Sequence, residues 1–226
     1  MPFRHSLLCV LLLSWLSACA TLGLPSEAQR SFEQGLALFQ QGRYAEAVPH
    51  LQQATELDAN FGKAYLYLGR SYLNLGQWSQ AIAPVRTAFR LAPQESKQEV
   101  TQLLLDVLFG GATAALKKGN FGESIGLLKE ALTLSPQAPN LQFQLVAALL
   151  GLGGQLLTQG KLSEAIATFT EATQRSPQHV EGYVGLARAL WQQGNILQAL
   201  TIARTALNLA PQNDAVRSLL QQLQRR

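Results

Sequence analysis

The sequence predicts an all-α protein in which pairs of helices repeat along the chain, and two observations lead to this fold class. The first is a short phrase that begins with glycine and recurs five times, at Gly42, Gly76, Gly119, Gly160 and Gly194. The second is that each copy is followed, at constant offsets, by an apolar residue, an alanine and usually Leu-x-Pro. Units of this kind cannot cover their apolar faces alone, so neighbouring units are expected to stack.

The spacings of the five glycines are 34, 43, 41 and 34 residues. A 34-residue unit resembles the tetratricopeptide repeat, whose first helix carries an aromatic residue, Leu-Gly and Tyr, and whose second helix carries two alanines and a final proline. The second unit matches this signature throughout, through Tyr65, Leu68, Gly69, Tyr72, Ala81, Val85, Ala88 and Pro93. The resemblance implies five repeats, at 28–61, 62–95, 105–138, 146–179 and 180–213.

The resemblance implies a superhelical solenoid of about five helix pairs, and elementary geometry supports each part of a pair. The turn glycine suits the left-handed conformation at a helix end, and the proline stops the second helix. The last segment, 214–226, reads as an amphipathic capping helix with its apolar residues inward: Val216, Leu219, Leu220 and Leu223.

The two long steps predict longer first helices in the third and fourth repeats. We expect one helix from about Glu95 to Lys118 and another that starts near Asn140. Each holds a glycine pair, Gly110-Gly111 and Gly153-Gly154, which costs about 1 kcal/mol per glycine relative to alanine. This cost suggests close backbone contact, most simply between the two long helices.

We expect the extra turns of these helices to form a ridge, which would be a second interface for partners or for self-association. The ridge would expose five apolar side chains: Val100, Leu103, Leu104, Leu141 and Phe143. The alternative is that the two extensions bury each other.

The N-terminus has the organisation of an export signal. A polar start with Arg4 precedes an apolar run, Ser6–Leu16, that is too short to span a membrane. Leu16-Ser17-Ala18-Cys19 resembles the bacterial lipobox, which implies that residues 1–18 are removed, that Cys19 is lipidated and that 19–27 form a short linker. Ala20 after the cysteine points to the outer membrane, facing the periplasm. The alternative is an N-terminal helix that packs on the body of the protein.

Composition excludes several function classes. The net charge of +4 falls to +3 without Arg4 and is scattered, which argues against nucleic-acid binding. The histidines, His5, His50 and His179, share no metal-ligand spacing, and no catalytic set of residues is present, so we expect neither a metal, a cofactor nor an enzyme. The uncharged stretch 139–160 contains glutamines and reads as a buried helix rather than a membrane span.

In tetratricopeptide folds the first helix of each repeat lines a concave groove. Carried over to this chain, the groove residues are Phe32, Leu36, Phe39, Lys63, Leu66, Arg70, Asn74, Phe109, Thr113, Lys117, Val184, Arg188 and Trp191. Aromatic and arginine side chains dominate binding hot spots, so Arg70 and Trp191 are the expected anchors. The alternative for each aromatic residue is packing against adjacent helices. Asp106 replaces a lysine of the carboxylate clamp found in one subfamily, which argues against a chaperone-tail function.

The sequence therefore predicts a lipid-anchored adaptor that binds other envelope proteins through peptide or helix segments. The alternative is an enzyme or a small-ligand carrier that uses a cavity in the solenoid.

Overall fold

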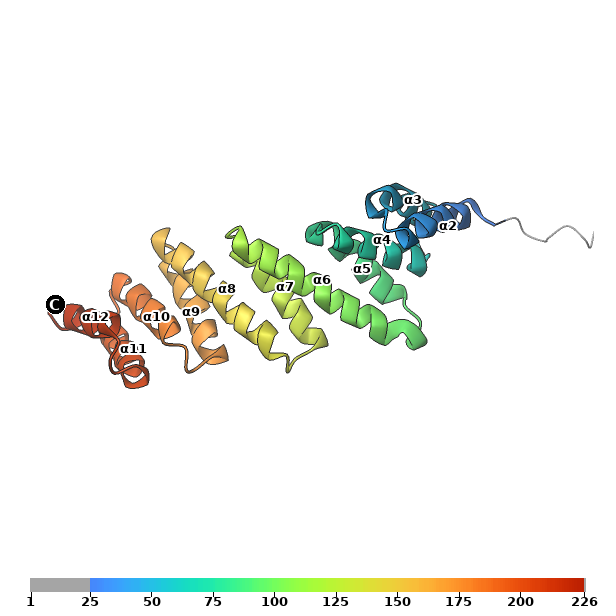
Figure 1. The fold of residues 1–226 in the computed structure, drawn as a ribbon. Coiled ribbons are helices and arrows are strands. Elements are labelled where there is room, and N and C mark those ends of the chain that lie inside the picture. Colours follow the sequence, from blue (N-terminus) through green and yellow to red (C-terminus); the bar gives the residue numbers. More distant parts are fainter. Residues whose placement is uncertain (1–24, 226) are drawn as a thin grey trace, which may run out of the picture. The chain divides into compact units, whose positions relative to one another are not determined.

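The computed structural model describes residues 25–225, and this range folds into eleven α-helices and one 3₁₀ turn (Figure 1). Within it the helices follow one another in pairs joined by short turns, and no strand is present. The predicted all-α fold of repeated helix pairs is confirmed. The lipobox and Cys19 lie outside the described residues.

The contacts of the chain divide it after Val100 into two compact units, here called the N-terminal unit and the C-terminal unit. The N-terminal unit contains α2 (Glu27–Gln40), α3 (Tyr44–Leu57), α4 (Gly62–Asn74), α5 (Trp78–Leu91) and the 3₁₀ turn Gln94–Ser96. In this unit α3 packs against both α2 and α4, and α5 packs against α4. Its core is made of side chains that are 0% exposed, such as Leu51 and Val85.

The boundary between the units falls within the long helix α6 (Lys97–Lys117). The C-terminal unit continues with α7 (Phe121–Leu134), α8 (Pro139–Thr158), α9 (Leu162–Arg175), α10 (Val180–Gln192), α11 (Ile196–Leu209) and α12 (Asp214–Gln224). From α7 to α12 each helix packs against the next along the chain. The helices are stacked in sequence order, as the repeat pattern requires.

The five repeated glycines occupy the turns between the two helices of each pair, and each has a positive φ, between 70° and 91°. At Gly42, where φ is 76°, the backbone N–H donates to the carbonyl of Phe39 and closes the end of α2. An L side chain at this φ would be strained, which explains the choice of glycine.

The C-terminal helix α12 covers the end of the C-terminal unit. The Asn213 side chain accepts hydrogen bonds from the backbone N–H groups of Ala215 and Val216 and so caps the helix. The four apolar residues predicted to face inward, Val216, Leu219, Leu220 and Leu223, are all buried. This expectation is confirmed.

The exposed ridge predicted on the two long helices is wrong for four of its five residues. Val100, Leu103, Leu104 and Leu141 are between 2% and 8% exposed. The first three recur at helical spacing with Val107 and Leu108, so they form the apolar face on which α6 packs. Only Phe143, which is 67% exposed, faces solvent as predicted.

Of the glycine pair predicted to make a close contact in α8, Gly153 meets another helix than the sequence suggested, and a Cβ built on Gly154 would meet nothing within 4 Å. A Cβ built on Gly151 would lie 2.3 Å from Cε1 of Phe121, and one built on Gly153 would lie 2.7 Å from Cε1 of Phe169. These rings belong to α7 and α9, so the close contact expected with the other long helix is replaced by contacts with second helices. The reason is steric, since each glycine makes room for a bulky ring on an adjacent helix.

Two helical stretches in the described part of the chain, Gln94–Lys117 and Pro139–Thr158, are long and apolar enough to cross a membrane by length and composition. The second stretch is α8, which packs against α7 on one side and α9 on the other. Its Leu145 and Leu149 are 0% and 2% exposed. These contacts favour the interpretation of α8 as a core helix.

Candidate functional site

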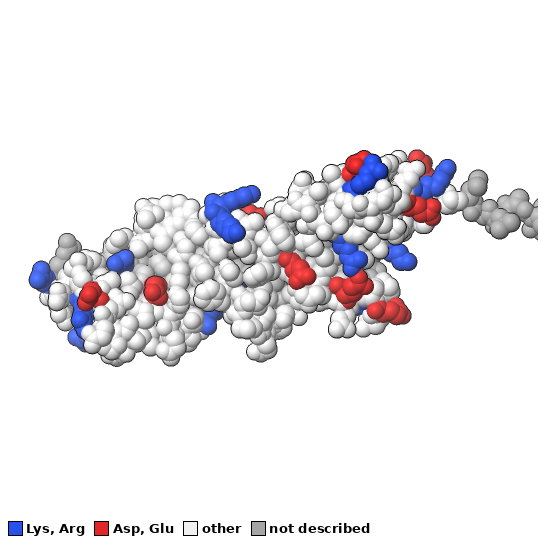
Figure 2. Space-filling view, in the orientation of Figure 1, with Lys and Arg blue, Asp and Glu red and all other residues white. Residues whose placement is uncertain are grey.

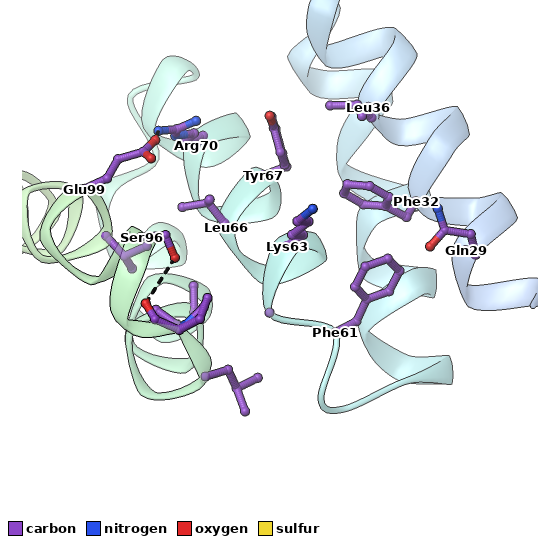
Figure 3. A pocket seen from close by; sticks show the side chains of 16 residues that line it. Gln29, Phe32, Leu36, Phe61, Lys63, Leu66, Tyr67, Arg70, Ser96 and Glu99 are labelled. Atoms are coloured by element: carbon purple, nitrogen blue, oxygen red, sulfur yellow. Dashed lines mark hydrogen bonds and ion pairs between the residues drawn. The ribbon is translucent and has the colours of Figure 1, made fainter.

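A cavity of about 710 Å³ lies within the N-terminal unit, between α2, α4, the end of α5 and the first turn of α6. We call it the α2–α4 groove (Figure 3). Six of its lining residues occupy equivalent places on the two first helices: Gln29, Phe32 and Leu36 on α2, and Lys63, Leu66 and Arg70 on α4. Residues spaced by three and four share one face of a helix, which explains why these side chains converge.

Five of these six residues were predicted as groove residues from the sequence, and the structure brings all five to one cavity. The sixth, Gln29, occupies the same place on α2 as Lys63 does on α4. The signal for it was therefore its position as the second residue of the first repeat, which matches that of Lys63 in the second repeat. What the five residues bind stays a prediction.

One wall of the α2–α4 groove is aromatic. The ring centroids of Phe32 and Phe61 are 4.8 Å apart, and those of Phe32 and Tyr67 are 5.9 Å apart. Phe32 is only 6% exposed because these two rings cover it. The wall is therefore a packed, rigid surface whose shape is set before any partner arrives.

Arg70 lies where this wall meets the start of α6. Its guanidinium carbon is 5.7 Å from the centre of the Tyr67 ring, within the range of a cation–π contact. Its Nη2 donates to a carboxylate oxygen of Glu99, and the two side chains face each other in Figure 3. The Arg70 side chain is 28% exposed, whereas that of Glu99 is 59% exposed.

The segment that carries Glu99 is fastened to α5. The Nζ of Lys97 lies 3.9 Å from the centre of the Phe89 ring and donates to the Phe89 carbonyl. The hydroxyl of Ser96, the residue just before Lys97, donates to the carbonyl of Pro93. These bonds hold the first turn of α6 at the end of the groove.

The remaining predicted groove residues do not line the α2–α4 groove. The Phe39 ring packs against Tyr44 and Tyr67, and the Asn74 side chain donates to the carbonyl of Arg70 in its own helix. For Phe39, packing against neighbouring aromatic residues is thus the better description.

In the C-terminal unit the predicted groove residues lie on α6 and α10. The Thr113 hydroxyl donates to the carbonyl of Phe109 within α6, while Val184 and Trp191 pack against the apolar core of the unit. Lys117 and Arg188 are exposed. Trp191 is therefore in part a core residue, which weakens its case as an anchor for a partner.

Besides Gln29, sequence reasoning missed the aromatic and acidic residues of the groove lining: Phe61, Tyr67 and Glu99. A signal existed for Tyr67, because it precedes Arg70 by three residues and such pairs meet on a helix. Phe61 is the residue before α4, and Glu99 belongs to the residues added between the second and third repeats. The signature of the repeat says nothing about either position.

Charged side chains do not gather into a basic patch on the face shown in Figure 2, where both signs are scattered and much of the surface carries neither. Among residues 25–225, no three His, Cys, Asp or Glu side chains lie close enough to hold a metal ion.

The family model described as "Tetratricopeptide repeat" matches residues 38–103 and 156–223, more than half of the chain. Among solved structures, a TPR repeats protein from Bacteroides fragilis is similar with a TM-score of 0.55 and 13% identity, over 88% of this chain and 99% of that one. At this identity the likeness concerns the fold alone.

Two curated relatives are similar over part of the chain. The BBSome complex member BBS4 homolog of Drosophila melanogaster is 33% identical over 90 residues, which are 38% of this chain. The cellulose synthase operon protein C of Escherichia coli strain K12 is 30% identical over 129 residues, which are 57% of this chain. The chain spans only 18% and 11% of the lengths of these relatives.

Proposed function

Because the chain belongs to the tetratricopeptide repeat family, whose members mediate protein–protein interactions, we propose that it is an adaptor anchored by lipid in the bacterial cell envelope. Its partners are other envelope proteins, which it binds through the α2–α4 groove. The observation that carries this proposal is the convergence of equivalent residues from α2 and α4 on one cavity.

The composition of the groove suits a segment of a protein. Leu36, Leu66 and the rings that cover Phe32 offer apolar surface, while Lys63 and Arg70 offer charge at its edge. Binding hot spots are enriched in aromatic residues and arginine and lie in desolvated pockets. A partner segment would bury an apolar side chain against the wall and pair a polar group with Arg70.

Anchoring in the envelope is supported by the sequence of the first 20 residues. The thiol of Cys19 would carry the acyl chains, each buried methylene contributing about 0.8 kcal/mol to membrane binding. Ala20 favours the outer membrane, with the repeats facing the periplasm. The linker up to residue 27 is short, so the groove would work close to the membrane surface.

Affinity capture of the full chain from detergent-solubilised membranes tests the adaptor. We expect the wild-type chain to recover one defined envelope complex. Leu66→Arg should abolish recovery, because a guanidinium in the apolar part of the groove would block a partner's side chain.

Leu57→Arg is the matched control, because Leu57 is 47% exposed at the end of α3 and does not line the groove. It should leave recovery unchanged. Loss of the complex with Leu57→Arg but not with Leu66→Arg would contradict the groove. A co-purifying small molecule without a protein partner would favour the carrier alternative.

A further inference from the structure

We propose that the α2–α4 groove recognises an acidic side chain of its partner segment, and that Glu99 occupies the place of this carboxylate until the partner binds. The inference deepens the proposed function and rests on it, because it names the chemistry of the segment that the groove accepts.

Arg70 is held in position to receive a carboxylate. Its contact with the Tyr67 ring fixes the guanidinium at the edge of the groove, and the side chain is largely covered. Only Nη2 donates to Glu99, to a single oxygen, although a guanidinium can present two parallel donors to one carboxylate. A partner carboxylate that accepts from both donors would therefore bind Arg70 better than Glu99 does.

The Glu99 side chain can separate from Arg70 at little cost. Its side chain is 59% exposed, twice the exposure of Arg70, so its carboxylate can turn to solvent and remain hydrated. Ion pairs at the surface contribute little to stability. Breaking the Arg70–Glu99 pair so that a better-placed carboxylate can bind Arg70 therefore costs little free energy.

Glu99 lies outside the regular repeats. It comes from the nine residues that lengthen the step between the second and third repeats, whereas Arg70 lies in the first helix of a regular repeat. Lys97 fastens this added segment to Phe89 of α5, two residues before Glu99. The added segment thus presents its own carboxylate to the cation of the groove.

The charges of the groove point to the same partner. Its lining holds two cations, Lys63 and Arg70, and one anion, Glu99. Lys63 is exposed and makes no ion pair within residues 25–225. Once Glu99 turns away, two positive charges face a cavity whose remaining wall is apolar and aromatic. The complementary segment carries an Asp or Glu close to an apolar side chain.

Selection from a library of random peptides, displayed with the C-terminus blocked, tests this inference on the full chain. Wild type should enrich peptides in which an acidic residue neighbours an apolar one. Glu99→Gln should bind a selected peptide more tightly, by about two- to fivefold, because the internal competitor is gone. Arg70→Ala should lower the affinity for the same peptide by about tenfold or more.

Glu95→Gln is the matched control, since Glu95 lies in the 3₁₀ turn just before the added segment, is exposed and does not line the groove. It should change the affinity of the peptide by less than Glu99→Gln. Arg70→Lys should keep part of the affinity because it keeps the charge.

The outcomes separate this inference from the proposed function. Peptides that lose binding with Leu66→Arg but show no preference for acidic residues would overturn the inference and leave the groove as a partner site. Equal binding by wild type and Glu99→Gln would also overturn it. If the selected peptides bind Leu66→Arg and Arg70→Ala as tightly as wild type, the proposed groove function itself would be overturned.

Discussion

The ring of Phe169 in α9 lies directly against the backbone of α8 at Gly153, where a Cβ would come within 2.7 Å of the ring atoms Cε1 and Cζ. Phe169 is 4% exposed, so its ring is packed inside the unit and not at the surface. It also fills the space beside Gly185 of α10, where a Cβ would lie 2.3 Å from Cε1. One aromatic side chain thus sets how closely three helices approach.

Gly153→Ala should destabilise the protein. Alanine gains about 1 kcal/mol in helix propensity, but overpacking against a fixed ring costs about 1–3 kcal/mol. The neighbouring Gly154 is the control, because a Cβ there meets nothing within 4 Å, so Gly154→Ala should stabilise. Thermal unfolding of the two variants checks this, and a higher Tm for Gly153→Ala would contradict the packing described.

Ser124→Ala should raise the free energy of unfolding by about 1 kcal/mol, because the Ser124 hydroxyl is 0% exposed and has no hydrogen-bond partner among the described residues. Four other repeats hold alanine at this position: Ala47, Ala81, Ala165 and Ala199. Ser71 is equally buried, but its hydroxyl donates to the carbonyl of Tyr67 at 2.8 Å. Ser71→Ala should therefore give no such gain in denaturant unfolding, and a loss of stability with Ser124→Ala would count against an unpaired hydroxyl.

The stability contribution of Glu171 should disappear in acid. Partial burial raises the pKa of this carboxyl, but hydrogen bonds from Lys129 and Arg175 outweigh burial and place the pKa below its ordinary value of 4.5. A lowered folded pKa adds stability above the unfolded pKa, and this stability is lost as the pH falls through the folded value.

Glu171→Gln should thus lower the free energy of unfolding at pH 7, by about 0.2–1 kcal/mol, as for ion pairs near the surface, and have less effect near pH 3. Denaturant unfolding at both pH values measures the difference. Glu56→Gln, at an exposed residue of α3, controls for the change in net charge. An effect of Glu171→Gln that is equal at both pH values would argue against the ion pairs.

Cys19→Ser should abolish incorporation of labelled palmitate in a bacterial host and leave an uncleaved precursor. Cys9→Ser is the matched control, because residue 9 lies in the segment expected to be removed, and it should be processed normally. Normal processing and labelling of Cys19→Ser would refute the lipid anchor.

The fold could be predicted because five copies encode it redundantly. The turn glycine, the small residues of the second helix and the final proline give the same helix pair each time, so the weaker copies are interpreted by analogy with the better ones. The inward face of α12, which has no second copy, followed instead from the helical spacing of Val216, Leu219 and Leu220.

The groove could be predicted only as far as the repeat is regular. Phe32, Leu66 and Arg70 were found because equivalent positions on first helices share one face. The Arg70–Glu99 pair could not be found, because its partners are 29 residues apart and one lies in an added segment without a template. The burial of Val100 was missed because sequence does not show which side of a lengthened helix meets a neighbour.

Site-specific photo-crosslinking in cells tests the central claim, that the α2–α4 groove is the surface that binds a partner. A benzophenone amino acid at Leu66 or at Leu36 should crosslink the full chain to one envelope protein, whereas the same group at Gln53, exposed on α3, should not. Crosslinks from Gln53 together with none from Leu66 and Leu36 would contradict the account.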